Sequence, residues 1–325
     1  MAGDIGADAL DPELKAMIER AALAGGQGIR ELPIVQAREA YRERYLARGI
    51  ERPKETVSVT ELLIDLPGRK LPARLYRSRQ ARMKPALMVY FHGGGYVVGD
   101  RDAYDDQSRA LAAASDCDIF FVEYRRAPEN RFPAAVEDAL ESFEWVRTHA
   151  AALGVGPDRI AVGGDSAGGA LAVVVTLFRR DLGLPLPALC FTLYPWLDMR
   201  PYAGRGDYSS IARFSRGYFL DRETMEWFST SYLGSSAEMA EDRRASPILW
   251  ETLHGMPETI LITAEFDPLR DMGEAFASRL AEAGVPVKSL RMAGMIHNFI
   301  GYAGVSTGAA GAFHEAARRL RLALS

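Results

Sequence analysis

Apolar residues gather into short continuous runs along most of the chain. The runs of strand length are residues 86–91, 119–123, 160–162, 188–194 and 259–264. A strand that helices cover on both faces of a parallel sheet has this pattern, so the runs predict buried central strands. Residues 57–66 and 71–76, joined by a turn at Pro67-Gly68, and residues 287–292 predict further strands.

Segments with apolar residues at helical spacing lie between these strands. They are residues 105–114, 134–150, 170–180, 271–283 and 309–322. Strands and helices that alternate in this way predict an α/β fold with a mostly parallel central sheet, flanked by helices and connected by right-handed crossovers.

Two regions fall outside this alternation. Residues 1–50 predict two helices, one starting at the cap-like Asp11 and one covering about 35–46. Residues 198–240 are aromatic and polar, with helical spacing over 222–232. We predict that 1–50 is an N-terminal helical cap segment, although a simple extension also explains it, and that 198–240 is a cap insertion. The remaining residues form the predicted catalytic domain, 51–197 and 241–325.

One turn carries the main candidate for chemistry. The run 160–162 leads into Gly164-Asp165-Ser166-Ala167-Gly168, which fits G-x-S-x-G, and a helix follows. A strand, a sharp turn and a helix in this order expose the serine hydroxyl at the edge of the sheet. The glycines are expected because the backbone is strained at Ser166 and side chains beside it would collide with neighbouring elements. We interpret Asp165 as a stabiliser of the turn and not as a reacting group.

A serine hydroxyl attacks well only when a base takes its proton, and a base with a pKa near neutrality suits this task. Of the five histidines, only His297 lies in a loop directly after the last predicted strand. His149 lies at a helix end, His254 in a loop before a strand, and His314 within the closing helix. The sequence therefore predicts His297 as the base.

The histidine needs a carboxylate that fixes its tautomer and stabilises its charged form. Asp267 follows the strand 259–264 directly, whereas Glu265 belongs to the strand end and Asp271 is explained by its place near a helix start. We predict Asp267 as the acid. Its place between Ser166 and His297 in the chain fits the order expected for a catalytic triad on this fold.

The strand 86–91 ends in His92-Gly93-Gly94-Gly95-Tyr96. Attack on an ester carbonyl places negative charge on its oxygen, which preorganised N–H groups must meet. Glycines allow the backbone to approach a substrate closely. We expect His92 and Gly93 to support this loop. The predicted donors of the oxyanion hole are the N–H groups of Gly94, Gly95 and Ala167.

Composition changes this picture little. The chain has 325 residues, of which 48% are hydrophobic and 25% charged, and a net charge of -4, which favours neither nucleic acid nor an anionic membrane as a partner. No apolar run is long enough to span a membrane, and the first residues lack the pattern of a secretory signal, so a cytoplasmic location is the default expectation. Cys117 and Cys190 lie in or beside apolar runs and are interpreted as core residues, with no metal role.

Five ordered motifs resemble the hormone-sensitive-lipase-like branch of the α/β-hydrolase esterases. They are HGGGY at 92–96, YRRAPENRFPAAVEDAL at 124–140, GDSAGG at 164–169, DPLRD at 267–271 and GMIHNF at 294–299. The resemblance implies the α/β-hydrolase fold with a small helical cap, and a serine carboxylesterase that hydrolyses short- to medium-chain acyl esters without a cofactor. Glu123 and Arg126 depart from the usual Asp and Leu of the second motif.

The partner implied by this resemblance is a small-molecule ester, and the last strand and final helix are candidate surfaces of a homodimer. Three other activities stay open on the same scaffold: an amidase or acyltransferase, a lactone hydrolase, and a non-catalytic ligand-binding receptor. Aromatic and aliphatic side chains suit an acyl chain or an aromatic alcohol. The candidate pocket residues, for some of which core packing is an equal explanation, are Tyr96, Val97, Phe214, Phe219, Ile296 and Phe299.

Overall fold

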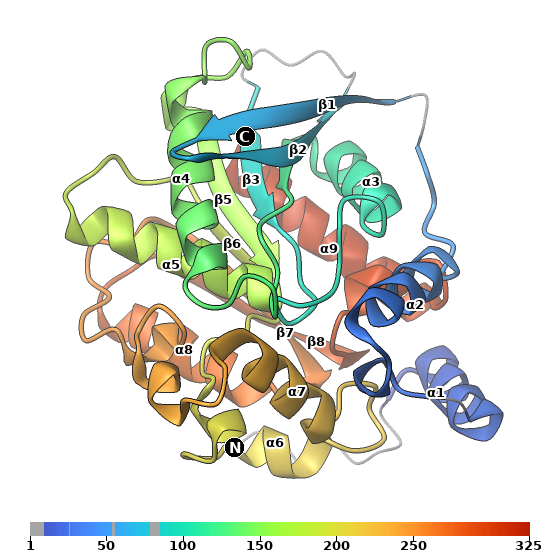
Figure 1. Cartoon of the computed structure of the whole chain (residues 1–325). Helices are drawn as coiled ribbons and strands as arrows, with labels where there is room; N and C mark the ends of the chain where they lie inside the picture. The colour runs from blue at the N-terminus through green and yellow to red at the C-terminus, as the bar shows by residue number, and fades with distance from the viewer. Residues whose placement is uncertain (1–9, 26, 54–55, 79–84) are drawn as a thin grey trace.

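The predicted strands form one eight-stranded sheet in the computed structural model (Figure 1), which describes residues 10–25, 27–53, 56–78 and 85–325. The strand order is β1-β2-β4-β3-β5-β6-β7-β8. β2 pairs antiparallel with both β1 and β4, and the other neighbours are parallel. The strands are β1 (Val57–Leu66), β2 (Arg69–Ser78), β3 (Leu87–Phe91), β4 (Asp118–Val122), β5 (Ile160–Asp165), β6 (Cys190–Leu193), β7 (Thr259–Phe266) and β8 (Val287–Ile296).

Helices cover the sheet on both faces, and alternate residues of the central strand β3 show why. Leu87 and Phe91 belong to the buried cluster that includes side chains of α4, α5 and α8, whereas Met88 and Tyr90 belong to the cluster that includes α3 and α9. This double burial explains the continuous apolar runs. The helices are α3 (Asp105–Ser115), α4 (Ala134–Thr148), α5 (Ala167–Asp181), α8 (Arg270–Glu282) and α9 (Thr307–Ala323).

Several strands differ in length from the prediction, since β2, β5 and β7 are longer than their apolar runs, and the differences at β6 and β8 have a local backbone cause. β6 ends at Leu193 because Tyr194 has φ 37°, a left-handed conformation that ends the extended backbone. β8 runs on to Ile296, beyond the predicted end at residue 292, because a register shift near Ala264 lets Phe266 pair with Ile296.

The two predicted cap regions are largely helical. They contain α1 (Pro12–Ala24), capped by the Asp11 side chain, and α2 (Ile34–Leu46), then α6 (Ser209–Phe214) and α7 (Arg222–Leu233). The short α6 was not predicted. Arg30 and Asp221 form an ion pair of 3.4 Å that joins the two regions. Figure 1 shows α6 and α7 beyond the end of the sheet toward which the β3 arrow points. Residues 1–9 and 26 of the first predicted segment lie outside the described part of the chain.

Cys117 and Cys190 are both buried, as predicted for core residues. Over the described ranges, none of the helices combines the length and the apolar character that a bilayer crossing demands.

Candidate active site

Ser166 stands between β5 and α5 in the strained conformation predicted for the turn. Its φ is 54°. A Cβ at Gly168 would collide with the backbone of Phe91. A Cβ at Gly164 would collide with the backbone of Gly168 and of Phe91. The Ser166 N–H donates to Leu193 O at 2.9 Å, which fixes the turn against β6. The small glycines thus allow Ser166 to adopt a left-handed backbone conformation between the end of β5 and the first residue of α5.

His297 and Asp267 come together with Ser166 at the ends of their strands. His297 Nε2 lies 2.9 Å from Ser166 Oγ, and His297 Nδ1 lies 2.7 Å from Asp267 Oδ2. All three residues are buried, with exposed fractions of 7% or less. Asp267 Oδ1 accepts from the Leu269 N–H at 2.8 Å, which holds the carboxylate with its other oxygen toward the ring. The Tyr194 ring packs on the His297 ring at 4.8 Å.

The other histidines and acids have different partners. His149 stacks on Trp145, and His254 Nδ1 lies 3.3 Å from Ala283 O. Glu265 Oε2 accepts from the Gly294 N–H, and Asp271 accepts from the N–H of Ser210. Each of these side chains has a local structural role that explains its place.

Asp165 joins the serine turn to the glycine loop. Its carboxylate accepts hydrogen bonds from the Tyr90 hydroxyl at 2.7 Å, the Gly93 N–H at 2.9 Å and the Tyr104 hydroxyl at 3.2 Å. Burial raises the pKa of Asp165 to about 6, while these donors act in the opposite direction. These three hydrogen bonds hold the carboxylate between the serine turn and the glycine loop.

The loop after β3 presents free backbone donors. Gly94 has φ 101° and Gly95 φ 59°, and Gly94 O accepts from the N–H groups of Val97 and Val98. Within the described ranges, the N–H groups of Gly94, Gly95 and Ala167 have no hydrogen-bond partner. Unpaired N–H groups are rare in buried backbone. These three N–H groups can therefore donate hydrogen bonds to an anionic oxygen.

His92 is held rigidly under this loop. It stacks on Tyr124 with 4.3 Å between ring centroids, and its Nδ1 lies 2.6 Å from Gly93 O. Burial, the largest cause, lowers the pKa of His92 to about 3, and nearby Arg126 acts in the same direction. The ring is therefore neutral at ordinary pH and can support the loop but not carry charge.

The candidate pocket residues fall into three groups: two beside His297, three buried elsewhere in the chain's core, and one that is partly exposed. Phe299 is buried and packs on Tyr194 at 5.3 Å, and Ile296 is buried in β8 next to His297. Phe214 packs on Phe266, Val97 is buried, and Tyr96 stacks on Tyr232 of α7 at 3.9 Å. Phe219 is 44% exposed and packs edge-on against Tyr302.

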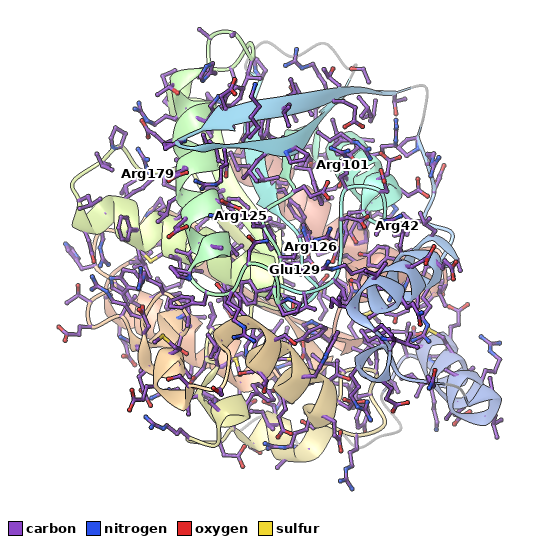
Figure 2. All side chains as sticks on the ribbon, viewed as in Figure 1. Arg42, Arg101, Arg125, Arg126, Glu129 and Arg179 are labelled. Carbon is purple, nitrogen blue, oxygen red and sulfur yellow. The ribbon has the colours of Figure 1, made fainter. Side chains whose placement is uncertain are left out.

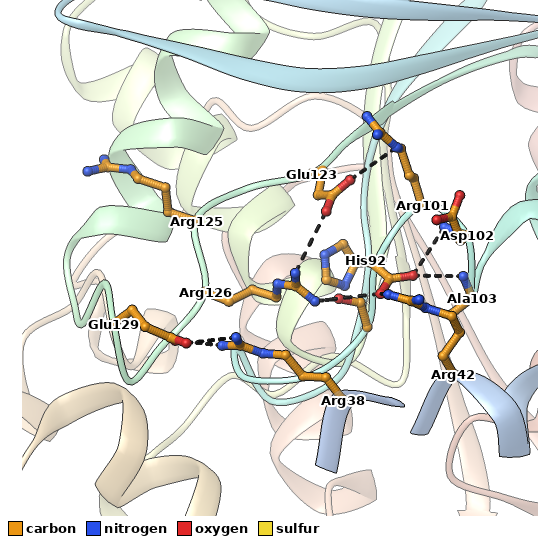
Figure 3. A network of polar contacts seen from close by, with 12 residues as sticks. Arg38, Arg42, His92, Arg101, Asp102, Ala103, Glu123, Arg125, Arg126 and Glu129 are labelled. Atoms are coloured by element: carbon orange, nitrogen blue, oxygen red, sulfur yellow. Dashed lines mark hydrogen bonds and ion pairs between the residues drawn. The ribbon is translucent and has the colours of Figure 1, made fainter. Parts of the chain in front are cut away.

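The two departures from the family motif belong to one polar network (Figure 3). Arg126 donates to Gly99 O and lies 3.7 Å from Glu123 and 3.8 Å from Asp100. Arg101 pairs with Glu123 from the other side at 3.4 Å. The two unusual residues, Glu123 and Arg126, therefore form an ion pair with each other. Figure 2 shows Arg42, Arg101 and Arg126 gathered between α2, α3 and α4.

Helix α2 joins this network. Arg38 donates to Val97 O at 2.9 Å and to Glu129, and Arg42 pairs with Asp100 at 2.7 Å. The N-terminal region therefore holds the far end of the glycine loop. Among the described residues, no group of three or more His, Cys, Asp or Glu side chains is arranged to hold a metal ion.

Sequence reasoning missed Phe228 of α7. A Cβ on Gly95 would collide with the Phe228 ring, so this side chain lies directly against one candidate donor. Phe228 is one of several apolar residues at helical spacing in α7, and only the long-range contact distinguishes it.

Known proteins are similar over almost the whole chain. A family model described as alpha/beta hydrolase fold matches residues 88–301. The carboxylic ester hydrolase LipN of Mycobacterium tuberculosis is 36% identical, over 99% of this chain and 85% of that protein. An arylesterase of Saccharolobus solfataricus is 35% identical over 90% and 92% of the two chains, and an ethyl acetate hydrolase of Pseudomonas putida is 35% identical over the same shares.

Solved structures show the same similarity. A thermostable esterase from Pseudomonas putida has a TM-score of 0.91 and 30% identity, over 99% of each chain. An ester hydrolase from the metagenome of Lake Arreo, in complex with a derivative of bipyridine phosphonate, has a TM-score of 0.89 and 33% identity, over 96% of this chain and 98% of that chain.

Proposed function

The chain belongs to the hormone-sensitive-lipase-like branch of the α/β-hydrolase family and is a carboxylic ester hydrolase, and we propose that it works through a covalent acyl-enzyme on Ser166. Ser166 Oγ attacks the ester carbonyl carbon while His297 Nε2 takes its proton and then gives it to the departing alcohol. Water then attacks the acyl group, with His297 again as the base, and Ser166 is restored.

The observation that carries this proposal is the continuous path from Ser166 Oγ to Asp267, with distances of 2.9 and 2.7 Å. Both distances are within the range of a hydrogen bond, so a proton can pass from Ser166 Oγ to His297 Nε2 without movement of the backbone. Asp267 keeps the proton of the neutral ring on Nδ1, which leaves Nε2 free to accept.

The oxyanion that forms in each step is assigned to the N–H groups of Gly94, Gly95 and Ala167. The absence of partners for these groups among the described residues supports the assignment. Three donors that are fixed before the reaction stabilise the transition state more than the neutral ester, because charge develops on the oxygen only during attack.

We further propose short- to medium-chain acyl esters as substrates. Two relatives are named arylesterase and ethyl acetate hydrolase, and in this chain the Tyr194 ring packs on the His297 ring beside the buried Ser166. Aromatic surfaces suit small apolar groups. Residues 10–50 and 198–240 are proposed to act as the cap, since α2 and α7 contact the glycine loop. We also propose a homodimer through α9 and β8, which is the last strand in the sheet order, and a cytoplasmic location.

The direct experiment compares Ser166→Ala with Ser278→Ala in the hydrolysis of p-nitrophenyl butyrate. Ser278 is exposed in α8, so the second change is a matched control. The first variant should lose about a millionfold in kcat and the control should keep parent activity. A Ser166→Ala protein with more than a tenth of the parent rate contradicts the proposal. A series of p-nitrophenyl esters from acetate to palmitate then measures the preferred chain length.

A further inference from the structure

A buried arginine without an acidic partner lies next to the candidate active site. Arg48, just after α2, is 8% exposed, and its Nη1 has no hydrogen-bond partner in the part of the chain that the structure describes. No carboxylate of those residues lies within ion-pair distance of it. Buried charges in proteins are normally paired, so this guanidinium calls for an anion.

The surroundings of Arg48 form a cage with one wall toward solvent. The guanidinium carbon lies 4.3 Å from the ring centroid of Tyr45, 4.0 Å from Tyr302 and 5.7 Å from Phe219. Aromatic faces attract a cation, and the Tyr302 hydroxyl interacts with the guanidinium as well, but none of these groups supplies a carboxylate. Phe219 is 44% exposed, so a ligand that displaces this one side chain would reach the guanidinium.

The cage borders the loop that carries the base. A Cβ on Gly301 would lie 2.7 Å from Arg48 Nη1 and 2.8 Å from Asn298 Oδ1, and Asn298 directly follows His297. The unpartnered nitrogen is therefore within reach of the segment that positions His297.

A second buried polar group without a hydrogen-bond partner among the described residues packs on the segment that follows β8. The Tyr194 hydroxyl is buried without a hydrogen-bond partner among the described residues, while its ring packs on His297 and Phe299. Arg48 contacts Tyr302, three positions after Phe299 in the same segment. Two buried donors without a partner in the described ranges, both in contact with the segment 297–302, indicate a ligand with acceptor oxygens.

We propose that Arg48 and the Tyr194 hydroxyl bind a free carboxylate of the substrate, so that the preferred ester carries a second, negatively charged carboxyl group. A monoester of a dicarboxylic acid has this chemistry: one end reacts at Ser166 and the other end pairs with the guanidinium. This inference rests on the proposed function, because it assumes that the ester end reacts at Ser166.

The test pairs each charged ester with a neutral one of the same shape. Monoethyl succinate, glutarate and adipate are compared with the ethyl esters in which a methyl ketone replaces the carboxylate, by acid release at constant pH. The parent should prefer at least one charged member by about ten- to a hundredfold in kcat/KM. Arg48→Met should lose this preference and still hydrolyse the neutral esters. Arg20→Met, an exposed change of equal charge on α1, should keep it.

The outcomes separate the two claims. An Arg48→Met protein with the parent's charge preference, or a parent without any preference, overturns the inference while hydrolysis of neutral esters still supports the proposed function. Failure of the parent to hydrolyse any ester overturns the proposed function instead. If Arg48→Met does not fold, inhibition of the parent decides: glutarate should compete with a neutral ester, and neutral glutaramide should not. Equal inhibition by both compounds overturns the inference.

Discussion

The strand ends and the cap segments build the two sides of the site in different ways. On the first side, Ser166, Asp267 and His297 follow β5, β7 and β8, and two hydrogen-bond distances below 3 Å join them. On the second side, α2 and α7 reach the glycine loop through separate long-range contacts, such as Arg38 to Val97 and Phe228 to Gly95. Strand pairing fixes the first side, and individual side chains fix the second.

This difference predicts two kinds of effect. Changes at the strand ends should lower turnover of every ester, because they alter groups that act on the reacting atoms. Changes on the cap side should alter which ester is preferred, or how firmly the loop is held, and leave the chemistry itself intact.

The largest effect is expected from Asp267→Asn. An amide that donates to His297 Nδ1 would force the wrong tautomer and leave Nε2 unable to take the serine proton. We expect kcat to fall by about ten-thousandfold for charged and neutral esters alike. Steady-state kinetics measure this, with the exposed Asp158→Asn as control. A loss that differs strongly between esters would break the distinction between the two sides.

The next effect is on stability and depends on pH. His92 has a pKa of about 3 in the folded protein against 6.5 ordinarily, so between these values the unfolded chain binds a proton that the folded chain does not. The free energy of unfolding should therefore fall as the pH is lowered through this window, by about 5 kcal/mol from His92 in total.

Asp165 has the opposite sign, because its folded pKa of about 6 lies above the ordinary 3.8. Acidification through that window favours the folded state at Asp165 and offsets part of the loss at His92. A comparison of parent and His92→Gln cancels Asp165. Between about pH 7 and pH 4 the stability advantage of the parent should shrink by about 3 kcal/mol in urea unfolding. A constant difference across that range contradicts the buried neutral imidazole.

A smaller effect tests the contact between the two sides. In Gly95→Ala the new methyl group meets the Phe228 ring, and φ 59° at this position is unfavourable for alanine. Displacement of one oxyanion donor should lower kcat by about a hundred- to a thousandfold. Adding Phe228→Ala should recover part of the loss if the ring causes the displacement. If kcat does not recover, the backbone conformation at residue 95 alone causes the loss, and α7 does not constrain the loop.

The smallest effect is expected at Arg126. Arg126→Leu restores the usual family residue but leaves Gly99 O without this donor and Glu123 with Arg101 as its remaining ion-pair partner. We expect a loss of about 1–3 kcal/mol in unfolding free energy, with little change in kcat. Glu123→Gln in the same chain should recover part of this loss, because the partly buried carboxylate that has lost one of its two arginines is then removed. A more stable Arg126→Leu protein would contradict this account of the network.

Local sequence patterns predicted where the strands end and which residues follow them on the first side of the site. The strands, the strained turn at Ser166 and the places of Asp267 and His297 follow from apolar runs and from short motifs at strand ends. Arg48 gave no such signal, because its burial arises from Tyr302 and Gly301, more than two hundred positions along the chain. The short α6 and the contact of Phe228 also depend on tertiary packing, which overrides local preference.

The central claim is that an acyl group passes through Ser166, and trapping that intermediate tests it most directly. A rapid acid quench during turnover of p-nitrophenyl butyrate, followed by peptide mass spectrometry, should find one butyryl group per chain, on Ser166. Ser166→Ala should carry none. Turnover at the parent rate with the acyl group on another residue, or with no trapped acyl group despite a burst of nitrophenol, would contradict the account.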